Sequence, residues 1–488
     1  MRQGGFHGGL RLDGQRHAAT RPIRRCALPA QLLLALRQHP GPPALPLVEP
    51  GQTVRAGQCI ARGDGPLAAD LHAPCHGVVE AVDRQGDGSI VLRTDPTDPG
   101  DPSGALPALD PEQVSAAAIR ARIAEAGIVG LGGAAFPTAA KLSAPTRIVL
   151  LNGIECEPLV ACDRRLLIER GQAVLAGGAL LGRALGAREL VLAVEDDLPE
   201  LVQAVRALHA PGPGFRLEIL PARYPQGSER QLIESVFGLR LAGTRLPRDA
   251  GIAVFNVATA EAVWQAVRHG RPLTHRLVGV AGDGVAEPVV LDAALGTPLA
   301  ELVAAAGGYR EDAARLILGG PLTGRPLPDD GRGLRKGDHA VTVLAGQGLP
   351  DRAPAMPCIR CGACAAACPA RLQPQLLWQF HLAGDGRRQL EHGLFDCIEC
   401  AVCDMVCPSR IPLAAGFAAD KEALREQAQA HELAMLAARR HAARSERLQR
   451  EAVEREAEQA EALRRELARK ALLEALAQTG KGGPGSRP

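Results

Sequence analysis

Two near-identical cysteine runs towards the end of the chain constrain its fold more than any other feature. Both have the spacing C-x2-C-x2-C-x3-C-P. In this spacing, three closely set thiolates bind one face of a cubane cluster, and the fourth binds the cluster of the other run. The eight residues are Cys358, Cys361, Cys364, Cys368, Cys397, Cys400, Cys403 and Cys407. We therefore expect a ferredoxin-like domain at residues 350–415, held mostly by its inorganic cores.

The spacing also predicts which thiolates share a cluster. The first [4Fe–4S] cluster would be bound by Cys358, Cys361, Cys364 and Cys407. The second would be bound by Cys397, Cys400, Cys403 and Cys368. Zinc is the alternative metal, but zinc sites use two C-x2-C pairs rather than triplets with a trailing Cys-Pro. This part of the chain is thus predicted to transfer electrons one at a time.

The composition excludes several other classes of protein. A length of 488 residues predicts about three or four domains. A formal net charge of +2 gives no electrostatic reason to expect nucleic-acid binding. No apolar run approaches the ~18 residues that would span a bilayer, and no apolar segment of a secretory signal precedes Arg11. Free thiols and iron–sulfur ligands indicate a reducing, cytoplasmic environment.

The first hundred residues predict a small β domain behind an extended arm. Residues 1–45 are rich in Gly, Pro and Arg and are expected to form the arm. Short β-type segments between residues 47 and 92 are separated by glycines, which is typical of hairpins. The phrase "PGQTVRAGQCIA…LHAPCHGVVEAV" resembles a barrel-sandwich hybrid of the biotinyl/lipoyl type. The first lysine of the chain is Lys141, so this domain carries no lysine-borne cofactor, and we expect a structural or docking role.

The middle of the chain predicts a multidomain α/β architecture. Residues 95–111 read as a linker, and residues 111–272 as a three-layer α/β domain with a parallel sheet. Its expected strands are 147–151, 189–194, 216–220 and 253–257, and its expected helices are 113–126, 164–186, 198–209 and 259–269. Residues 275–345, with one helix at 298–306, predict a ubiquitin-like β-grasp module of the SLBB type.

The last segment, residues 420–488, is predicted to be a charged helical tail. It is rich in Ala, Glu, Arg and Leu, and Glu461/Arg465 and Glu466/Lys470 stand four residues apart. Heptads are not sustained, so a coiled coil is not expected. A solvated surface helix and a docking helix for a partner both remain possible interpretations.

A glycine-rich turn at residues 127–138, "GIVGLGGAAFPT", is the second candidate site. Glycines before a helix let backbone N–H groups approach a phosphate closely. Lys141 follows and could contact a phosphate or a ribose. The alternative is a tight turn with no ligand.

Polar residues follow three of the expected strands. "LNGIECEP" places Asn152, Glu155 and Glu157 at the end of the first, where α/β folds bind ligands. "YPQGSER" and "FNVAT" place further polar groups at two other strand-to-helix junctions. Taken one at a time, each segment is more typical of a solvated or structural loop than of a binding site.

These phrases together resemble a known family. Residues 5–415 resemble the RnfC (RsxC) family, the peripheral NADH-side component of the Rnf ion-translocating electron transport complex, on "GLGGAAFPTAAKL", "LNGIECEPLVACDRRL", "YPQGSERQLI", "NVATAEAV" and both cysteine runs. The middle of the chain is also similar to the flavin-bearing, NADH-oxidising subunit of respiratory Complex I. That resemblance implies FMN on the α/β domain, with NADH stacked over its ring.

The resemblance to the Complex I subunit also implies cofactor-binding residues. Gly132 and Gly133 would lie against the nucleotide, with Phe136 and Lys141 on the NADH side. Asn152, Glu155 and Glu157 would line the flavin and nicotinamide pocket. Glu229 belongs to the turn matching the relative's "GEET", and Asn256 and Thr259 match its contact to the FMN tail. This chain departs from the relative at Leu131 and Ile154, where the relative has Arg and Asp, at Ser228, and near residues 142–144, where an aromatic residue is lost.

The two candidate sites predict one task. A flavin accepts two electrons as a hydride and releases them singly to a cluster, so no side chain is expected to act as a general acid or base. The resemblance implies a peripheral protein on the cytoplasmic side of the inner membrane, attached to the membrane through membrane-embedded and ferredoxin-like partner subunits. Two alternatives are an electron-transferring scaffold without a working flavin site, and a soluble NADH dehydrogenase or redox-sensor component. The other cysteines, Cys26, Cys59, Cys75, Cys156 and Cys162, show no metal spacing and are expected to be structural.

Overall fold

The structure is a computed structural model that describes residues 5–14, 17–65, 67–209, 212, 214–241, 243, 245–346 and 354–479. The chain divides into two units, Met1–Phe417 and Ala418–Pro488. The predicted domains 1–100, 350–415 and 420–488 extend, at residues 1–4, 350–353 and 480–488, outside the described residues.

The N-terminal domain consists of two small antiparallel sheets that share one apolar core. One sheet has the strand order β2-β8-β7-β4 and the other β3-β5-β6. The core includes Leu32, Leu34, Ile60, Ile90 and Leu92, which are fully buried. The strands are β2 (Gln31–Ala35), β3 (Leu45–Pro46), β4 (Thr53–Val54), β5 (Cys59–Arg62), β6 (Leu71–His72), β7 (Gly77–Asp83) and β8 (Ser89–Thr94).

The expectation that residues 1–45 form an extended arm is wrong for its second half. β2 pairs with β8 over residues 31–35 and supplies Leu32 and Leu34 to the core. β1 (Arg24–Arg25) pairs with β14 of a later domain. The short apolar run in "QLLLA" is consistent with a strand, and its residues alternate in burial, whereas β1 is stabilised by a strand more than 250 residues away.

The α/β domain has a parallel sheet of four strands in the order β11-β10-β9-β12. One face packs on α1, α3, α4 and α6, and the other on α5, because residues along each strand alternate between two separate cores. The strands are β9 (Ile148–Gly153), β10 (Glu189–Glu195), β11 (Phe215–Leu220) and β12 (Ile252–Asn256). The helices are α1 (Ala116–Glu125), α2 (Thr138–Lys141), α3 (Cys162–Leu185), α4 (Pro199–Arg206), α5 (Glu229–Phe237) and α6 (Val257–Arg268).

The next domain is a β-grasp sheet with one helix. Its order, β1-β14-β13-β17-β15-β16, places the parallel pair β13 and β17 at the centre, with hairpins on both sides. The elements are β13 (His275–Ala281), β14 (Val289–Ala294), α7 (Leu299–Ala305), β15 (Ala313–Leu318), β16 (Arg325–Leu327) and β17 (Ala340–Ala345). The predicted fold class is confirmed for both the α/β domain and this module.

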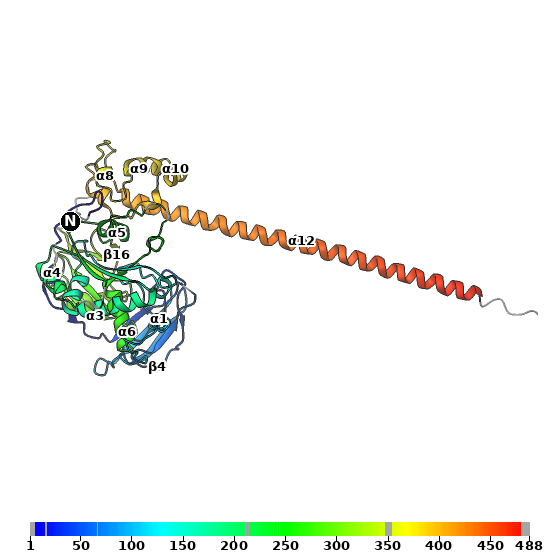
Figure 1. Cartoon of the computed structure of the whole chain (residues 1–488), viewed down its shortest axis with the longest axis horizontal. Helices are drawn as coiled ribbons and strands as arrows, with labels where there is room; N and C mark the ends of the chain where they lie inside the picture. Colours follow the sequence, from blue (N-terminus) through cyan, green and yellow to red (C-terminus); the bar gives the residue numbers. More distant parts are fainter. Residues whose placement is uncertain are drawn as a thin grey trace, which may run out of the picture. The chain divides into compact units, whose positions relative to one another are not determined.

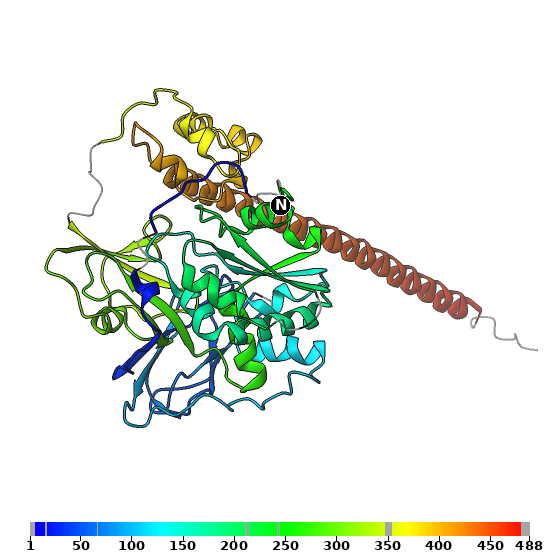
Figure 2. The same cartoon turned by 60° about the vertical axis from the view of Figure 1, so that its left-hand side comes forward.

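The cysteine-rich segment contains only short helices, as its composition predicts. They are α8 (Ala363–Ala367), α9 (Pro374–Leu382), α10 (Gly386–Glu391) and α11 (Val402–Met405). The blue N-terminal segment lies beside this yellow region in both views (Figures 1 and 2). Three-residue and four-residue 3₁₀ turns, η1 (His17–Thr20), η2 (Pro247–Ala250) and η4 (Leu394–Asp396), complete the described elements.

The C-terminal helix α12 (Leu413–Thr479) is one uninterrupted helix (Figure 1). The predicted pairs Glu461/Arg465 and Glu466/Lys470 form ion pairs with N···O distances of 2.5 Å and 3.7 Å. These side chains are largely exposed, so each pair adds only a few tenths of a kcal/mol to the helix. Within the described residues, no helix is both long and apolar enough to cross a bilayer.

Candidate electron-transfer site

The eight cysteines of the two runs surround two separate cavities. One cavity is lined by Cys358, Cys361, Cys364 and Cys407. The other is lined by Cys368, Cys397, Cys400 and Cys403. These are the two sets of four that the crossed pairing of the runs predicts. The residues present therefore fit two cubane clusters, with the last thiol of each run lying at the cavity of the other run.

The surroundings of the two cavities differ in exposure. Cys358 and Cys361 are exposed, as are their neighbours Met356 and Ile359. Cys368, Cys400 and Cys403 are buried. We call the cavity of Cys368, Cys397, Cys400 and Cys403 the inner cluster site, and the other the outer cluster site.

A larger cavity, of about 240 Å³, lies at the carboxyl ends of β9 and β12, and we call it the central cavity. Among the residues predicted to bind cofactor, Gly132, Asn152, Glu155, Glu157 and Asn256 line it. This is the edge where parallel α/β sheets bind ligands. The structure thus brings the glycine turn, the acidic strand end and the "FNVAT" junction to one place.

The glycine turn is closed by its own backbone. Gly130 N–H donates to Phe136 O at 2.7 Å, and Ala135 N–H donates to Gly130 O at 3.1 Å. Leu131 N–H donates to Thr259 Oγ1 at 2.9 Å, which anchors the turn on α6. A Cβ placed on Gly132 would lie 3.4 Å from Asn256 Cβ, so the absence of a side chain leaves space in the cavity at this point.

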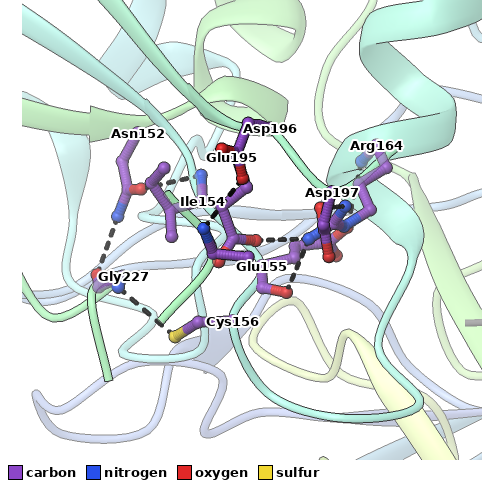
Figure 3. A network of polar contacts seen from close by, with 10 residues as sticks. Asn152, Ile154, Glu155, Cys156, Arg164, Glu195, Asp196, Asp197 and Gly227 are labelled. Carbon is purple, nitrogen blue, oxygen red and sulfur yellow. Dashed lines mark hydrogen bonds and ion pairs between the residues drawn. The ribbon is translucent and has the colours of Figure 1, made fainter. Parts of the chain in front are cut away.

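Hydrogen bonds fix the polar end of β9 and connect it to the loop that contains Gly227 (Figure 3). Asn152 Nδ2 donates to Gly227 O at 2.9 Å, and Asn152 Oδ1 accepts from Ile154 N–H at 3.1 Å. Gly227 N–H in turn donates to Cys156 Sγ at 3.3 Å. Asn152 is therefore held in one orientation on the cavity lining, as a positioned polar contact requires.

Glu155 is held by the start of α3. Arg164 N–H donates to Glu155 Oε2 at 2.9 Å, and the Arg164 guanidinium forms ion pairs with Glu195 and Asp197 (Figure 3). Burial opposes the charge of Arg164, but the carboxylates of Glu195 and Asp197 outweigh it and raise its pKa. This buried ionic network holds Glu155 in place on the lining of the central cavity.

Asp163, in the phrase "ACDRRL", also lines the cavity but was not among the predicted site residues. Burial, together with the charge of Glu155, raises the pKa of Asp163 to about 8. Asn256 Nδ2 donates a short hydrogen bond to Asp163 Oδ2. His339, across the cavity, has its pKa lowered to about 4 by burial and by Arg276.

Five predicted cofactor-binding residues do not line this cavity. Lys141 Nζ donates to Val254 O at 2.8 Å and forms a half-exposed ion pair with Glu229 at 3.4 Å. Thr259 is fully buried behind Leu131. Gly133 and Phe136 belong to the closed glycine turn, beside the cavity rather than on it.

The β-grasp domain contributes a loop to the cavity. Glu157 accepts hydrogen bonds from Leu322 N–H at 2.8 Å, Thr323 N–H at 2.9 Å and Thr323 Oγ1 at 2.5 Å. Thr323 lines the cavity. Nothing in the local sequence marks Thr323 or His339, because they reach the cavity only through the packing of two domains.

The central cavity also touches the inner cluster site. Ile398 and Cys400 line both cavities. Tyr224 lines the central cavity and donates from its hydroxyl to Cys400 O at 2.8 Å. Burial raises the pKa of Tyr224 well above its ordinary value, so this hydroxyl keeps its proton at neutral pH. A redox group in the central cavity would thus lie next to a loop that carries predicted cluster ligands.

Fold and site together define a flavin-type electron-transfer protein with two iron–sulfur clusters. Four family descriptions match in chain order: "RnfC Barrel sandwich hybrid domain" at residues 4–88, "Nuo51 FMN-binding domain" at 123–265, "SLBB domain" at 277–326 and "4Fe-4S dicluster domain" at 357–411. The FMN and the two clusters expected from the sequence are thereby confirmed at the level of these domains. The chain belongs to the RnfC family of ion-translocating oxidoreductase complex subunits.

Curated relatives show this membership over nearly the whole chain. The RnfC-type subunit of the ion-translocating oxidoreductase complex of Rhodobacter capsulatus is 39% identical over 443 residues, which cover 88% of this chain and 85% of the relative. The protein of the same name from Pseudomonas aeruginosa is 42% identical, over 87% of this chain and 56% of the relative. Among solved structures, an NAD⁺-reducing [NiFe]-hydrogenase aligns at 24% identity with a TM-score of 0.43, covering 66% of this chain and 63% of that chain.

Proposed function

We propose that this chain is the subunit of an Rnf-type complex that takes electrons from NADH through FMN and passes them singly along two [4Fe–4S] clusters. The observation that carries this proposal is the shared wall of the central cavity and the inner cluster site, formed by Ile398 and Cys400. A pocket for a two-electron cofactor that adjoins a one-electron carrier is the arrangement such a conversion needs.

The proposed site residues have distinct tasks. Gly132, Asn152 and Asn256 would hold the flavin by close backbone approach and amide contacts, and Glu155 and Glu157 would line the nicotinamide side. Lys141, Phe136, Gly133, Glu229 and Thr259 would support the nucleotide from the surrounding turns. The four cysteines of the inner cluster site would together bind one cluster, and the four of the outer cluster site would bind the other. The domain limits 1–100, 111–272, 275–345, 350–415 and 420–488 are part of the same proposal.

The electron balance of the proposed reaction is simple. One NADH gives up a hydride, which is two electrons and a proton, and becomes NAD⁺. Bound FMN supplies the chemistry of accepting a pair of electrons and releasing them one by one. The two electrons leave through the clusters, and the proton returns to solvent. The chain's own residues bind, orient and exclude water, so none of them is assigned as an acid or base.

The central experiment is an anaerobic titration of the purified chain with NADH. We expect bound FMN to bleach and cluster EPR signals to appear, with about eight iron atoms per chain as two cubanes require. Cys361→Ser should lower the iron content towards that of one cluster, whereas Cys26→Ser, outside both runs, should leave it unchanged. Bound clusters without flavin or bleaching would instead support the electron-transferring scaffold.

We further propose that the chain works on the cytoplasmic face of the inner membrane, attached through membrane-embedded and ferredoxin-like partner subunits. Relatives named as subunits of ion-translocating complexes support this placement. Cell fractionation tests it: the chain should sediment with membranes when the partner subunits are present and should be released when they are deleted. Retention in the soluble fraction in both strains would support a soluble NADH dehydrogenase instead.

A further inference from the structure

A short N-terminal segment, Phe6–Leu10, connects the inner cluster site to the α/β domain. On the cluster side, Gly9 N–H donates to Ala367 O at 2.8 Å, and His7 Nδ1 lies 3.1 Å from Cys368 O in a hydrogen bond. Cys368 is one of the four cysteines that line the inner cluster site. The segment therefore contacts the backbone of a predicted ligand directly.

On its other side, the same segment contacts Tyr224, which lines the central cavity, and the neighbouring Arg223. Leu10 and Tyr224 exchange two backbone hydrogen bonds, of 2.9 Å and 2.8 Å, in an isolated antiparallel bridge. Arg223 Nη1 donates to Phe6 O at 3.2 Å, and its guanidinium lies 5.1 Å from the Phe6 ring centroid. Phe6 is only 5% exposed. These contacts attach the segment to the loop that supplies Tyr224 to the cavity.

Two glycines allow this double contact. A Cβ on Gly8 would lie 2.4 Å from Ala367 O, and a Cβ on Gly9 would lie 2.5 Å from Tyr224 O. Both residues have positive φ, +67° and +72°, which side-chain-bearing residues rarely adopt. Gly5, directly before the segment, has no atom within 4 Å of the position its Cβ would take. The requirement for glycine is thus confined to the points of contact with the two loops.

The Tyr224 loop also contacts the second cysteine run at the cavity. The Tyr224 hydroxyl donates to Cys400 O, and Cys400 lines both the central cavity and the inner cluster site. Helix α5 supports the same region, since Gln231 Nε2 donates to Pro369 O at 3.3 Å. The segment and α5 therefore hold the Cys368 loop at two separate points.

We infer that Phe6–Leu10 is a positioning segment that holds the inner cluster site against the central cavity, so that electrons leaving the cavity enter the inner cluster first. The exposed outer cluster site is then the outlet of the pair. This inference rests on the proposed function. Each transfer moves one electron, so two successive transfers carry both electrons of one hydride. The segment makes no contact with reacting atoms and acts through the loops of Cys368 and Tyr224.

The test compares Gly9→Ala with the matched control Gly5→Ala in the purified, cluster-loaded chain. Stopped-flow absorbance follows flavin bleaching by NADH, and freeze-quench EPR follows the clusters. In Gly9→Ala we expect unchanged bleaching, an unchanged cluster spectrum after dithionite, and slower cluster reduction by NADH than in the unsubstituted chain, because electron transfer slows as the separation of the redox groups grows. Gly5→Ala should match the unsubstituted chain. His7→Ala, which removes a single hydrogen bond, should slow reduction less.

The order of the clusters is tested with one variant of each site. When Cys358→Ser abolishes the outer cluster, NADH should still reduce the inner one at the normal rate. When Cys400→Ser abolishes the inner cluster, the outer one should respond to dithionite but not to NADH.

The outcomes test the proposed function, the positioning role and the order of the clusters separately. No bleaching by NADH in the unsubstituted chain would refute the proposed function. Normal bleaching with equal cluster reduction in Gly9→Ala and Gly5→Ala would refute the positioning role alone. Rapid reduction of the outer cluster by NADH in Cys400→Ser would refute the order of the clusters.

Discussion

Replacing Gly177 with alanine should destabilise the α/β domain, although alanine is the better helix former. Gly177 lies in α3 where that helix crosses α6, and a Cβ at this position would lie 1.7 Å from Ala260 O and 2.5 Å from Ala260 C. The obstacle is backbone, so no side-chain rotation relieves it, and the two helices must move apart. Gly182, in the same helix, has no atom within 4 Å of its Cβ position.

The two substitutions should therefore have opposite signs. Overpacking against backbone should lower the free energy of unfolding by about 3 kcal/mol at Gly177. The higher helix propensity of alanine offsets about 1 kcal/mol of this, so the net loss of stability is about 2 kcal/mol. At Gly182 only the gain of up to about 1 kcal/mol remains. For a domain of this size, these values correspond to a Tm about 4–8 °C lower for Gly177→Ala and about 2–4 °C higher for Gly182→Ala.

The assay is thermal unfolding of the full chain followed by circular dichroism, with FMN content measured in parallel. α3 begins at Cys162, beside Asp163, and α6 begins directly after Asn256, so both helices carry residues of the central cavity. Gly177→Ala should therefore also lower FMN retention, and Gly182→Ala should not. A Gly177→Ala chain that melts at or above the temperature of the unsubstituted chain would refute the close-packing argument.

Three further perturbations have defined outcomes. Arg164→Met should cost about 3–5 kcal/mol in urea unfolding, since Glu195 would lose its buried guanidinium partner; a loss below about 1 kcal/mol would contradict this. Glu157→Gln should weaken the hydrogen bonds to Leu322 and Thr323 by about 1 kcal/mol and speed their amide hydrogen exchange, whereas unchanged exchange would show that the carboxylate does not hold the loop. Burial lowers the pKa of Lys336 to about 7, below that of an unfolded lysine. Between about pH 7 and 10 the unfolded chain then binds the extra proton, so stability should rise with pH by up to about 1.4 kcal/mol per unit, and Lys336→Met should remove this slope. Equal slopes in both proteins would exclude Lys336 as its source.

Local spacing made much of the architecture predictable. The parallel strands of the α/β domain and its helices follow from apolar periodicity, and the structure places α3 at Cys162–Leu185 where residues 164–186 were expected. The two sets of cysteines that line the cavities were predictable because three predicted ligands of each cluster lie within seven residues of one another. Asn152 and Glu155 could be chosen because they follow a strand, and strand ends gather at one sheet edge.

Other features could not be predicted, because they depend on contacts between distant segments. β1 is too short to be recognised as a strand and exists only by pairing with β14. Thr323 and His339 reach the cavity from the β-grasp domain. Lys141, predicted from the glycine turn and from the resemblance to the Complex I subunit, and Thr259, predicted from that resemblance, both lie outside the cavity lining. Backbone carbonyl and amide groups of neighbouring segments bind their polar atoms.

The sequence by itself determined the chemistry of this protein, since thiolate spacing selects the cluster type and glycine and acidic phrases select the nucleotide-binding family. The tertiary structure decided that the central cavity and the inner cluster site lie next to each other. Only folding brings Tyr224, Cys400 and Cys368 together with residues near the N-terminus. The contacts that fix this arrangement join residues up to 361 positions apart in the chain, and no local pattern encodes them. They matter because electron transfer depends on the separation of the redox groups.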